Sequence, residues 1–122
     1  MKTRNERLKE LFNDTRYLNE YIDINSVLNT EYYDEITSTD ELYNVLCERI
    51  NEVEIIYYSK AMEILKEEDQ SLTESLNLAN ELSYTPENLN SEILATLLIH
   101  ERCNDELNDF IQEVEEEEIF ND

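Results

Sequence analysis

The sequence predicts a small all-α protein of four to five helices that ends in a long acidic helix. Its 122 residues include no glycine and one proline, the residues on which sheet-and-turn architectures rely most to reverse the chain. Apolar residues recur at intervals of three and four along most of the chain, the spacing of a buried helix face. Because 40% of the residues are hydrophobic, we expect residues 1–122 to fold as a single domain.

Residues 2–22 form the first expected helical region, with a break near Asn13–Asp14. Its apolar side consists of Leu8, Leu11, Phe12, Leu18, Tyr21 and Ile22. Residues 1–16 hold five bases and three acids, a net charge of +2. Two interpretations are open: a basic arm that folds back on the acidic body by charge attraction, or an ordinary amphipathic helix with a frayed end. Residues 115–122 are similarly expected to be a frayed acidic tail.

Residues 23–38 are expected to be irregular, with a short helical turn over Glu31–Ile36. Cap and turn formers are frequent there, namely Asn25, Ser26, Asn29 and Thr30. Thr39 then suits the N-cap of a second helix, which we expect to continue to Leu65 or Glu67. The β-branched and aromatic stretch Val53–Tyr58 is also compatible with a strand. We favour the helix because the apolar spacing continues through Tyr57, Ala61, Ile64 and Leu65.

The last two expected helices lie in the second half of the chain. The first covers about residues 72–82 and begins after a cap at Asp69 or Ser71. The second begins with Thr85 as its cap, Pro86 in its first turn and an acid near its positive end. Its buried stripe is expected to contain Leu89, Ile93, Leu97, His100, Cys103, Leu107, Phe110 and Val114. If it continues to about Glu118, this helix is roughly 50 Å long.

Charge and composition exclude several classes of function. The 31 acids and 9 bases give a net charge of −22, far more than solubility requires. Such a surface repels nucleic acids and anionic membranes and attracts basic clefts, so direct DNA binding is excluded. The absence of glycine excludes Walker loops, dinucleotide-binding fingerprints, nucleophile elbows and EF-hand loops. No apolar run approaches the roughly 20 residues of a membrane span, and no signal peptide is visible.

The remaining catalytic and metal-binding alternatives are weak. His100 and Cys103 lie one turn apart, and Cys47 on a packed helix would complete three ligands for zinc, but the close cysteine pairs of zinc sites are missing. A nucleophile triad would need His100, the one histidine, which lies on the buried stripe. Paired carboxylates occur by chance in so acidic a chain. We therefore expect no enzyme activity, metal or cofactor, and reduced core thiols in a cytoplasmic protein of the host cell.

The acidic face of the last helix suggests a function. Between Glu87 and Asp122 there are twelve acids and a single base, Arg102. Like charges one turn apart repel by a few tenths of a kcal/mol per pair, so something other than helix stability favours this surface. Acids at this spacing lie about 5–6 Å apart, and a 50 Å helix spans roughly 15 base pairs of DNA. We interpret the following acids as phosphate mimics that bind a basic DNA-binding groove: Glu101, Asp105, Glu106, Asp109, Glu113, Glu115, Glu116, Glu117 and Glu118.

Two tyrosine doublets provide a second feature. At least one tyrosine in each of Tyr32–Tyr33 and Tyr57–Tyr58 is expected in the core, because the surroundings are not basic enough for nucleic-acid stacking. The functional alternative is an exposed patch for self-association through Tyr57 and Tyr58. A different class of function also stays open: an acidic helical adaptor or assembly protein that docks through Tyr57–Tyr58 and uses its charge for solubility.

Three segments resemble the phage "overcome classical restriction" (Ocr) proteins: YDEITSTDELYNVL at Tyr33–Leu46, the doublet Tyr57–Tyr58, and the EVEEEE run at Glu113–Glu118. The likeness extends over about residues 30–118. It implies an all-helical, often dimeric DNA mimic that occupies the DNA groove of type I restriction–modification enzymes and so protects phage or mobile DNA. By position, it implies four further phosphate mimics, Asp34, Glu35, Asp40 and Glu41. An anti-CRISPR inhibitor acting by the same charge mimicry is a close alternative.

Overall fold

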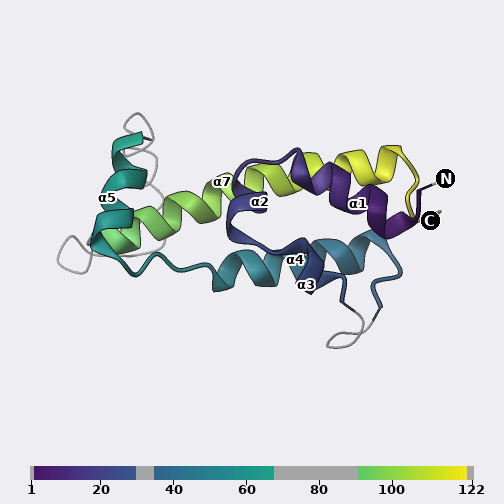
Figure 1. Cartoon of the computed structure of the whole chain (residues 1–122), viewed down its shortest axis with the longest axis horizontal. Coiled ribbons are helices and arrows are strands. Elements are labelled where there is room, and N and C mark those ends of the chain that lie inside the picture. Colours follow the sequence, from purple (N-terminus) through teal and green to yellow (C-terminus); the bar gives the residue numbers. More distant parts are fainter. Residues whose placement is uncertain (1, 30–34, 68–90, 121–122) are drawn as a thin grey trace. The chain divides into compact units, whose positions relative to one another are not determined.

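A computed structural model describes residues 2–29, 35–67 and 91–120 of the chain, and within them it contains helices and no strand. The helices are α1 (Arg4–Asn13), α2 (Tyr17–Tyr21), α3 (Ile24–Val27), α4 (Thr39–Glu52), α5 (Tyr58–Glu67) and α7 (Ser91–Glu116) (Figure 1). The predicted all-α class with a long C-terminal helix is therefore confirmed. In this part of the chain, no helix is both long and apolar enough to cross a membrane.

The chain divides into two compact units. The first unit comprises Met1–Glu52 and Cys103–Asp122, and the second comprises Val53–Arg102. Helix α7 therefore contributes its last part to the first unit and its first part to the second.

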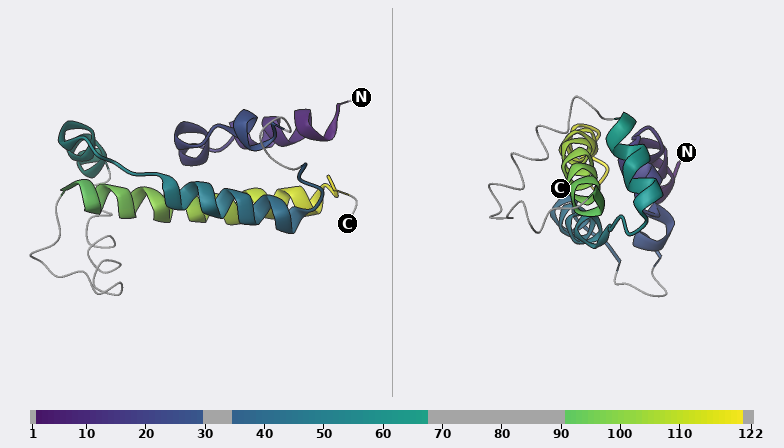
Figure 2. Two further views of the ribbon diagram at one scale, coloured as in Figure 1. Left: turned by 90° about the horizontal axis from the view of Figure 1, so that it is seen from below. Right: turned by 90° about the vertical axis from the view of Figure 1, so that its left-hand side faces the viewer.

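The core of the first unit lies between α1, α4 and the last part of α7. In this unit α4 and α7 run side by side in opposite directions, and the α1–α3 segment covers one face of the pair (Figure 2). The ring of Phe12 on α1 meets that of Phe110 on α7 edge-to-face, with centroids 5.6 Å apart. All three helices contribute fully buried side chains to the core of this unit, among them Leu8, Leu42, Leu46, Ile50, Leu107 and Val114.

The N-terminal region has the expected break after Asn13, and it contains one helix that was not predicted from the sequence. Helix α1 ends at Asn13, where the Thr15 hydroxyl donates a 2.6 Å hydrogen bond to the Phe12 carbonyl. The missed helix is α3, a single turn inside the expected irregular segment. It begins because the Asp23 carboxylate accepts a 3.0 Å hydrogen bond from the Asn25 amide. Of the expected turn at 31–36, residues 31–34 lie outside the described residues and residues 35–36 are not helical.

The expected continuous helix from Thr39 to Leu65 or Glu67 is wrong. The chain is extended over residues 53–57, between α4 and α5, and forms neither helix nor strand there. The Ile55 amide donates a 2.9 Å hydrogen bond to Thr96 Oγ1, and His100 Nε2 lies 2.7 Å from the Val53 carbonyl oxygen. Side chains of α7 thus satisfy backbone groups that a continuous helix would have paired. The β-branched residues of the segment also lose rotamer freedom in a helix, which favours the break.

The start of α4 differs by one residue from the prediction. Ser38 is the cap, since its hydroxyl accepts a 3.2 Å hydrogen bond from the Glu41 amide and its carbonyl accepts from the Leu42 amide. Thr39 is instead the first helical residue, and its side chain is buried. Glu41 reaches back to accept a 2.9 Å hydrogen bond from the Thr37 amide, which resembles the reciprocal contact of a capping box.

The expected helix over 72–82 and the expected start of the last helix at Thr85 lie outside the described residues. Helix α7 as described has 26 residues and is about 39 Å long at 1.5 Å per residue. It ends in a Schellman motif: the Ile119 amide bonds to the Val114 carbonyl at 3.3 Å, and the Glu118 amide to the Glu115 carbonyl at 3.1 Å. Glu118 therefore adopts φ = 51°, a conformation that glycine adopts at lower cost than other residues.

Glu118→Gly should stabilise the protein by about 1 kcal/mol, because the left-handed conformation costs a side chain with a Cβ about 1–2 kcal/mol and glycine recovers part of this. Thermal unfolding followed by circular dichroism should show a midpoint about 3–5 °C higher. Glu118→Gln is the matched control, since it removes the charge and keeps the Cβ. An equal gain in both variants would contradict the backbone explanation.

Thr96→Val should destabilise the protein by about 1–3 kcal/mol, because it leaves the amide of the buried Ile55 without its acceptor while conserving side-chain shape. Urea unfolding measures the loss, and hydrogen exchange at the Ile55 amide should accelerate. Thr96→Ser keeps the hydroxyl and should lose less than half as much. If the serine variant loses as much as the valine variant, the hydrogen bond is not what holds the extended segment.

Candidate interaction surface

Exposed carboxylates form a row along the last part of α7, within the first unit. Asp105, Asp109, Glu113 and Glu116 are all exposed and follow one another at intervals of four, four and three residues. At 100° per residue they lie within about 80° of one another around the helix. The buried Leu107, Phe110 and Val114 occupy the opposite side. The apolar stripe therefore fixes the direction in which this row points, away from the core.

The row approaches the charge density of one DNA strand. Between Asp105 and Glu116 there are five exposed acids once Glu115 is included. They span about 16 Å of helix in four intervals, roughly 4 Å per charge, whereas a DNA strand carries one phosphate per 3.4 Å of axis. The span corresponds to about five base pairs per copy, less than the 15 expected from the sequence. The difference arises because the described residues of α7 before Asp105 include two acids, Glu92 and Glu101, and neither is fully exposed.

A second set of exposed acids lies on α4 of the same unit. Asp40 and Glu41 stand in its first turn, and the sequence analysis had missed Glu48 and Glu52 further along. All four lie on the side away from the buried Leu42 and its neighbours. The signal that would have identified the two missed residues is their four-residue spacing from one another on the polar face of the expected helix.

Lys and Arg leave the α7 row uncompensated. Among the described residues, ion pairs join Lys2 to Glu10, Arg4 to Glu35, Arg7 to both Glu10 and Glu117, and Arg49 to Glu52. None of them involves Asp105, Asp109, Glu113, Glu115 or Glu116. Glu116 accepts a 3.1 Å hydrogen bond from Gln112, which is neutral. In its described residues the first unit holds eighteen acids and six bases, a net charge of −12.

The structure gives three predicted phosphate mimics other roles. Glu106 accepts hydrogen bonds from the Arg16, Tyr17 and Leu18 amides, so it caps the N-terminus of α2 from another helix. This carboxylate is committed to the fold, and its assignment to the surface row is wrong. Glu117 binds Arg7 at 2.6 Å, and Glu35 binds Arg4 at 3.0 Å.

These ion pairs come from the basic N-terminal segment, which forms the helix α1 and whose arginines bind acids elsewhere in the first unit, as the folded-back arm would. Hydrogen bonds to Glu117 and then to Glu10 raise the pKa of Arg7. A hydrogen bond from Lys2, followed by one from Arg7, lowers the pKa of Glu10. Lys2, Arg4 and Arg7 thus pair with Glu10, Glu35 and Glu117, and none of these ion pairs reaches the row from Asp105 to Glu116.

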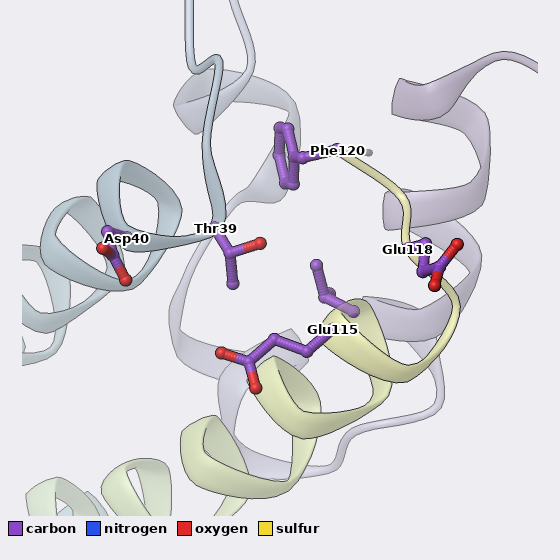
Figure 3. A pocket seen from close by; sticks show the side chains of 6 residues that line it. Thr39, Asp40, Glu115, Glu118 and Phe120 are labelled. Carbon is purple, nitrogen blue, oxygen red and sulfur yellow. The ribbon is translucent and has the colours of Figure 1, made fainter. Parts of the chain in front are cut away.

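A pocket of about 320 Å³ lies where the first turn of α4 meets the end of α7. Asp40, Glu115 and Glu118 line it together with Thr39, Val114 and Phe120, and Figure 3 shows the acid side chains around it. The Arg4 guanidinium stacks on the Phe120 ring, 4.9 Å from its centroid. The pocket therefore brings carboxylates from the α4 and α7 acid sets to one place in the first unit.

The remaining predicted residues fall into three groups. Glu101 is half-buried, Asp34 and Tyr32–Tyr33 lie outside the described residues, and Glu118 is exposed at the end of α7. Tyr57 and Tyr58 are 70% and 62% exposed, so the expectation that one of them lies in the core is wrong. Tyr57 directly precedes α5, and its carbonyl oxygen accepts a hydrogen bond from the Ala61 amide.

The zinc alternative gains no support. No cluster of three or more His, Cys, Asp or Glu side chains suited to a metal ion occurs in the part of the chain that is described. His100 binds the Val53 carbonyl. Burial, followed by the charges of Glu106 and Glu20, raises the pKa of the Cys103 thiol to about 12, so this thiol stays protonated. Cys103 is a buried core thiol as expected, whereas Cys47 is half-buried, and both are free.

Comparisons of the chain with protein-family models, with curated proteins and with solved structures found no match. The features that distinguish the chain are therefore the acid row of α7, which no described Lys or Arg pairs with, and the exposed Tyr57 and Tyr58.

Proposed function

We propose that this protein is a non-enzymatic DNA mimic that occupies the basic DNA-binding groove of a host defence protein. A type I restriction–modification enzyme is the first candidate target, and a CRISPR effector is the second. By filling the groove, the protein would protect phage or mobile DNA. The observation that carries the proposal is the exposed side of α7, where the row Asp105, Asp109, Glu113 and Glu116, with Glu115 beside it, pairs with no Lys or Arg among the described residues. These acids follow one another at roughly 4 Å per charge along the axis, close to the 3.4 Å per phosphate of one DNA strand.

In this mechanism, the carboxylates of the protein compete with DNA phosphates for the Lys and Arg side chains of the groove. A groove that grips phosphates does so mainly with Lys and Arg, and this contact is independent of base sequence. Carboxylates held on a helix with a buried apolar stripe are ordered before binding, so less conformational entropy is lost on association. The charge of −22 also steers the protein towards a positive groove and speeds encounter. One mimic could therefore inhibit enzymes of different sequence specificity.

The acids of α4 and of the pocket extend this interaction within the first unit. Asp40, Glu41 and Glu48 add charge on a second helix that runs beside α7 (Figure 2). Glu35 and Glu117 contribute less, because arginines of α1 already bind them. Glu106 has a structural role, because it caps the N-terminus of α2. It does not contact the target.

Neutralising the α7 row should weaken target binding more than the change in net charge explains. We expect the triple variant Asp105→Asn/Asp109→Asn/Glu113→Gln to bind its target about 10- to 150-fold more weakly, because each exposed contact contributes about 0.5–1 kcal/mol. The assay measures displacement of duplex DNA from a purified type I restriction–modification enzyme and, separately, from a CRISPR effector. Circular dichroism should show an unchanged helical content.

The matched control is Glu54→Gln/Glu63→Gln/Glu67→Gln, which removes three equally exposed charges from the second unit. It should lose less than about threefold in affinity. Equal losses in the two triple variants would mean that net charge alone drives binding and would contradict a mimic built on α7. Failure of the unmodified protein to displace DNA from either enzyme would remove both candidate targets.

A further inference from the structure

An acid that continues the α7 row is covered by an arginine of α1. Glu117 follows Glu113 at the same four-residue interval that separates Asp109 from Glu113. Its amide donates a 3.0 Å hydrogen bond to the Glu113 carbonyl, so it still has the position of a helical residue. Nε and Nη2 of Arg7 donate hydrogen bonds of 3.0 and 2.6 Å to one oxygen of Glu117. Without Arg7, Glu117 would therefore extend the row by one carboxylate.

Arg4 covers a second acid of the first unit. Its guanidinium donates a 3.0 Å hydrogen bond to Glu35, whose side chain is 65% exposed. The same guanidinium stacks on the Phe120 ring, 4.9 Å from the ring centroid. Arg4 and Arg7 are three residues apart and so lie on the same side of α1. This side of α1 therefore places two guanidinium groups on two acids outside the helix.

We propose that Arg4 and Arg7 are internal competitors, which occupy Glu35 and Glu117 in the free protein and are displaced from them by the Lys and Arg side chains of a basic partner. The contact is autoinhibitory, because it withholds two carboxylates from the surface that binds the partner. This inference rests on the proposed function, since it takes a basic groove as the partner. It adds that more acids contact the partner in the complex than are uncovered in the free protein.

Both ion pairs are suited to exchange, because each arginine keeps another contact when its acid is taken by a partner. Nη1 of Arg7 also binds Glu10 at 2.9 Å, and Arg4 also stacks on Phe120. The side chains of Arg4, Arg7 and Glu117 are 33%, 39% and 37% exposed, and ion pairs in contact with water contribute little to stability. An arginine that moves away from its acid is thus neither deeply buried nor without a partner.

The exchange does not require α1 to unfold or to leave the core. Leu8, Leu11 and Phe12 of this helix are buried. The Thr3 hydroxyl caps its N-terminus by accepting a 3.1 Å hydrogen bond from the Glu6 amide. These interactions hold the backbone of α1 in place while its long side chains rotate. Displacement is therefore a local change of two side chains, and the helical content measured by circular dichroism should not change.

The test compares Arg7→Gln with Lys9→Gln, two variants of α1 that each remove one positive charge. Lys9 joins none of the ion pairs found among the described residues, so its removal changes the net charge without uncovering an acid. The probe is a fluorescently labelled peptide of eight arginines, whose anisotropy measures its affinity for each variant at low salt. We expect Arg7→Gln to bind the peptide about two- to fivefold more tightly than the unmodified protein, and Lys9→Gln to stay within about 1.5-fold.

Failure of this inference is distinguishable from failure of the proposed function. The peptide has no DNA-binding groove, so a protein that cannot displace DNA from the restriction enzyme would leave the peptide result unchanged. Conversely, a protein that displaces DNA, but whose two α1 variants bind the peptide equally, would support the proposed function and overturn the autoinhibition.

A double-mutant cycle identifies the cause of the gain. In the Glu117→Gln background, Arg7→Gln has no acid to uncover at this position, so its gain in peptide affinity should fall to that of Lys9→Gln. Arg4→Gln, alone and in the Glu35→Gln background, provides the same comparison at the second ion pair if Arg7→Gln loses helical content. Equal peptide affinities of the arginine variant and Lys9→Gln, a gain that persists without the paired acid, or no peptide binding by any variant would overturn the inference.

Discussion

In the first unit, two free-energy terms act on α7 in opposite directions. Burial of its apolar stripe stabilises the helix, and repulsion among the acids on its other side destabilises it. Like charges one turn apart cost a few tenths of a kcal/mol per pair, so the row from Asp105 to Glu116 costs about 1–2 kcal/mol. Burial of Leu107, Phe110 and Val114 contributes about 1.5–3 kcal/mol for each large side chain. Burial exceeds repulsion, which is why a helix with almost no compensating bases remains in place and keeps its carboxylates exposed.

The same stripe explains what could be predicted from the sequence. Apolar residues at three- and four-residue intervals identified α7, the core cysteine Cys103 and the outward direction of Asp105, Asp109 and Glu113. Local signals of this kind also located the break after Asn13 and the acidic start of α4. The all-helical class follows because a chain without glycine has few means of making the tight turns that sheets need.

The errors arose where side chains from distant helices replace local interactions. Thr96 and His100 bind backbone groups of residues 53–55, more than 40 residues away in sequence, and no helical periodicity reports such a contact. The sequence predicts Glu106 as a surface acid because it shows no sign that the amides of residues 16–18 donate hydrogen bonds to this carboxylate. The wrong prediction of burial for Tyr57 and Tyr58 has the same cause. A segment that is not helical directs its side chains differently from the continuous helix that was expected.

The distribution of charge gives the two units different characters. The arginines of α1 bind Glu35 and Glu117, and the described bases leave the outer side of α7 uncovered. By sequence, the second unit, Val53–Arg102, holds ten acids and three bases, a net charge of −7, against −15 for the first unit.

The most direct test of the central claim is a competition titration with a purified type I restriction–modification enzyme, fluorescently labelled duplex DNA and the unmodified protein. If the acid row occupies the DNA groove, raising the DNA concentration should raise the apparent inhibition constant in proportion, and the affinity should fall steeply as salt increases. Inhibition that is independent of DNA concentration, or an affinity indifferent to salt, would contradict the account.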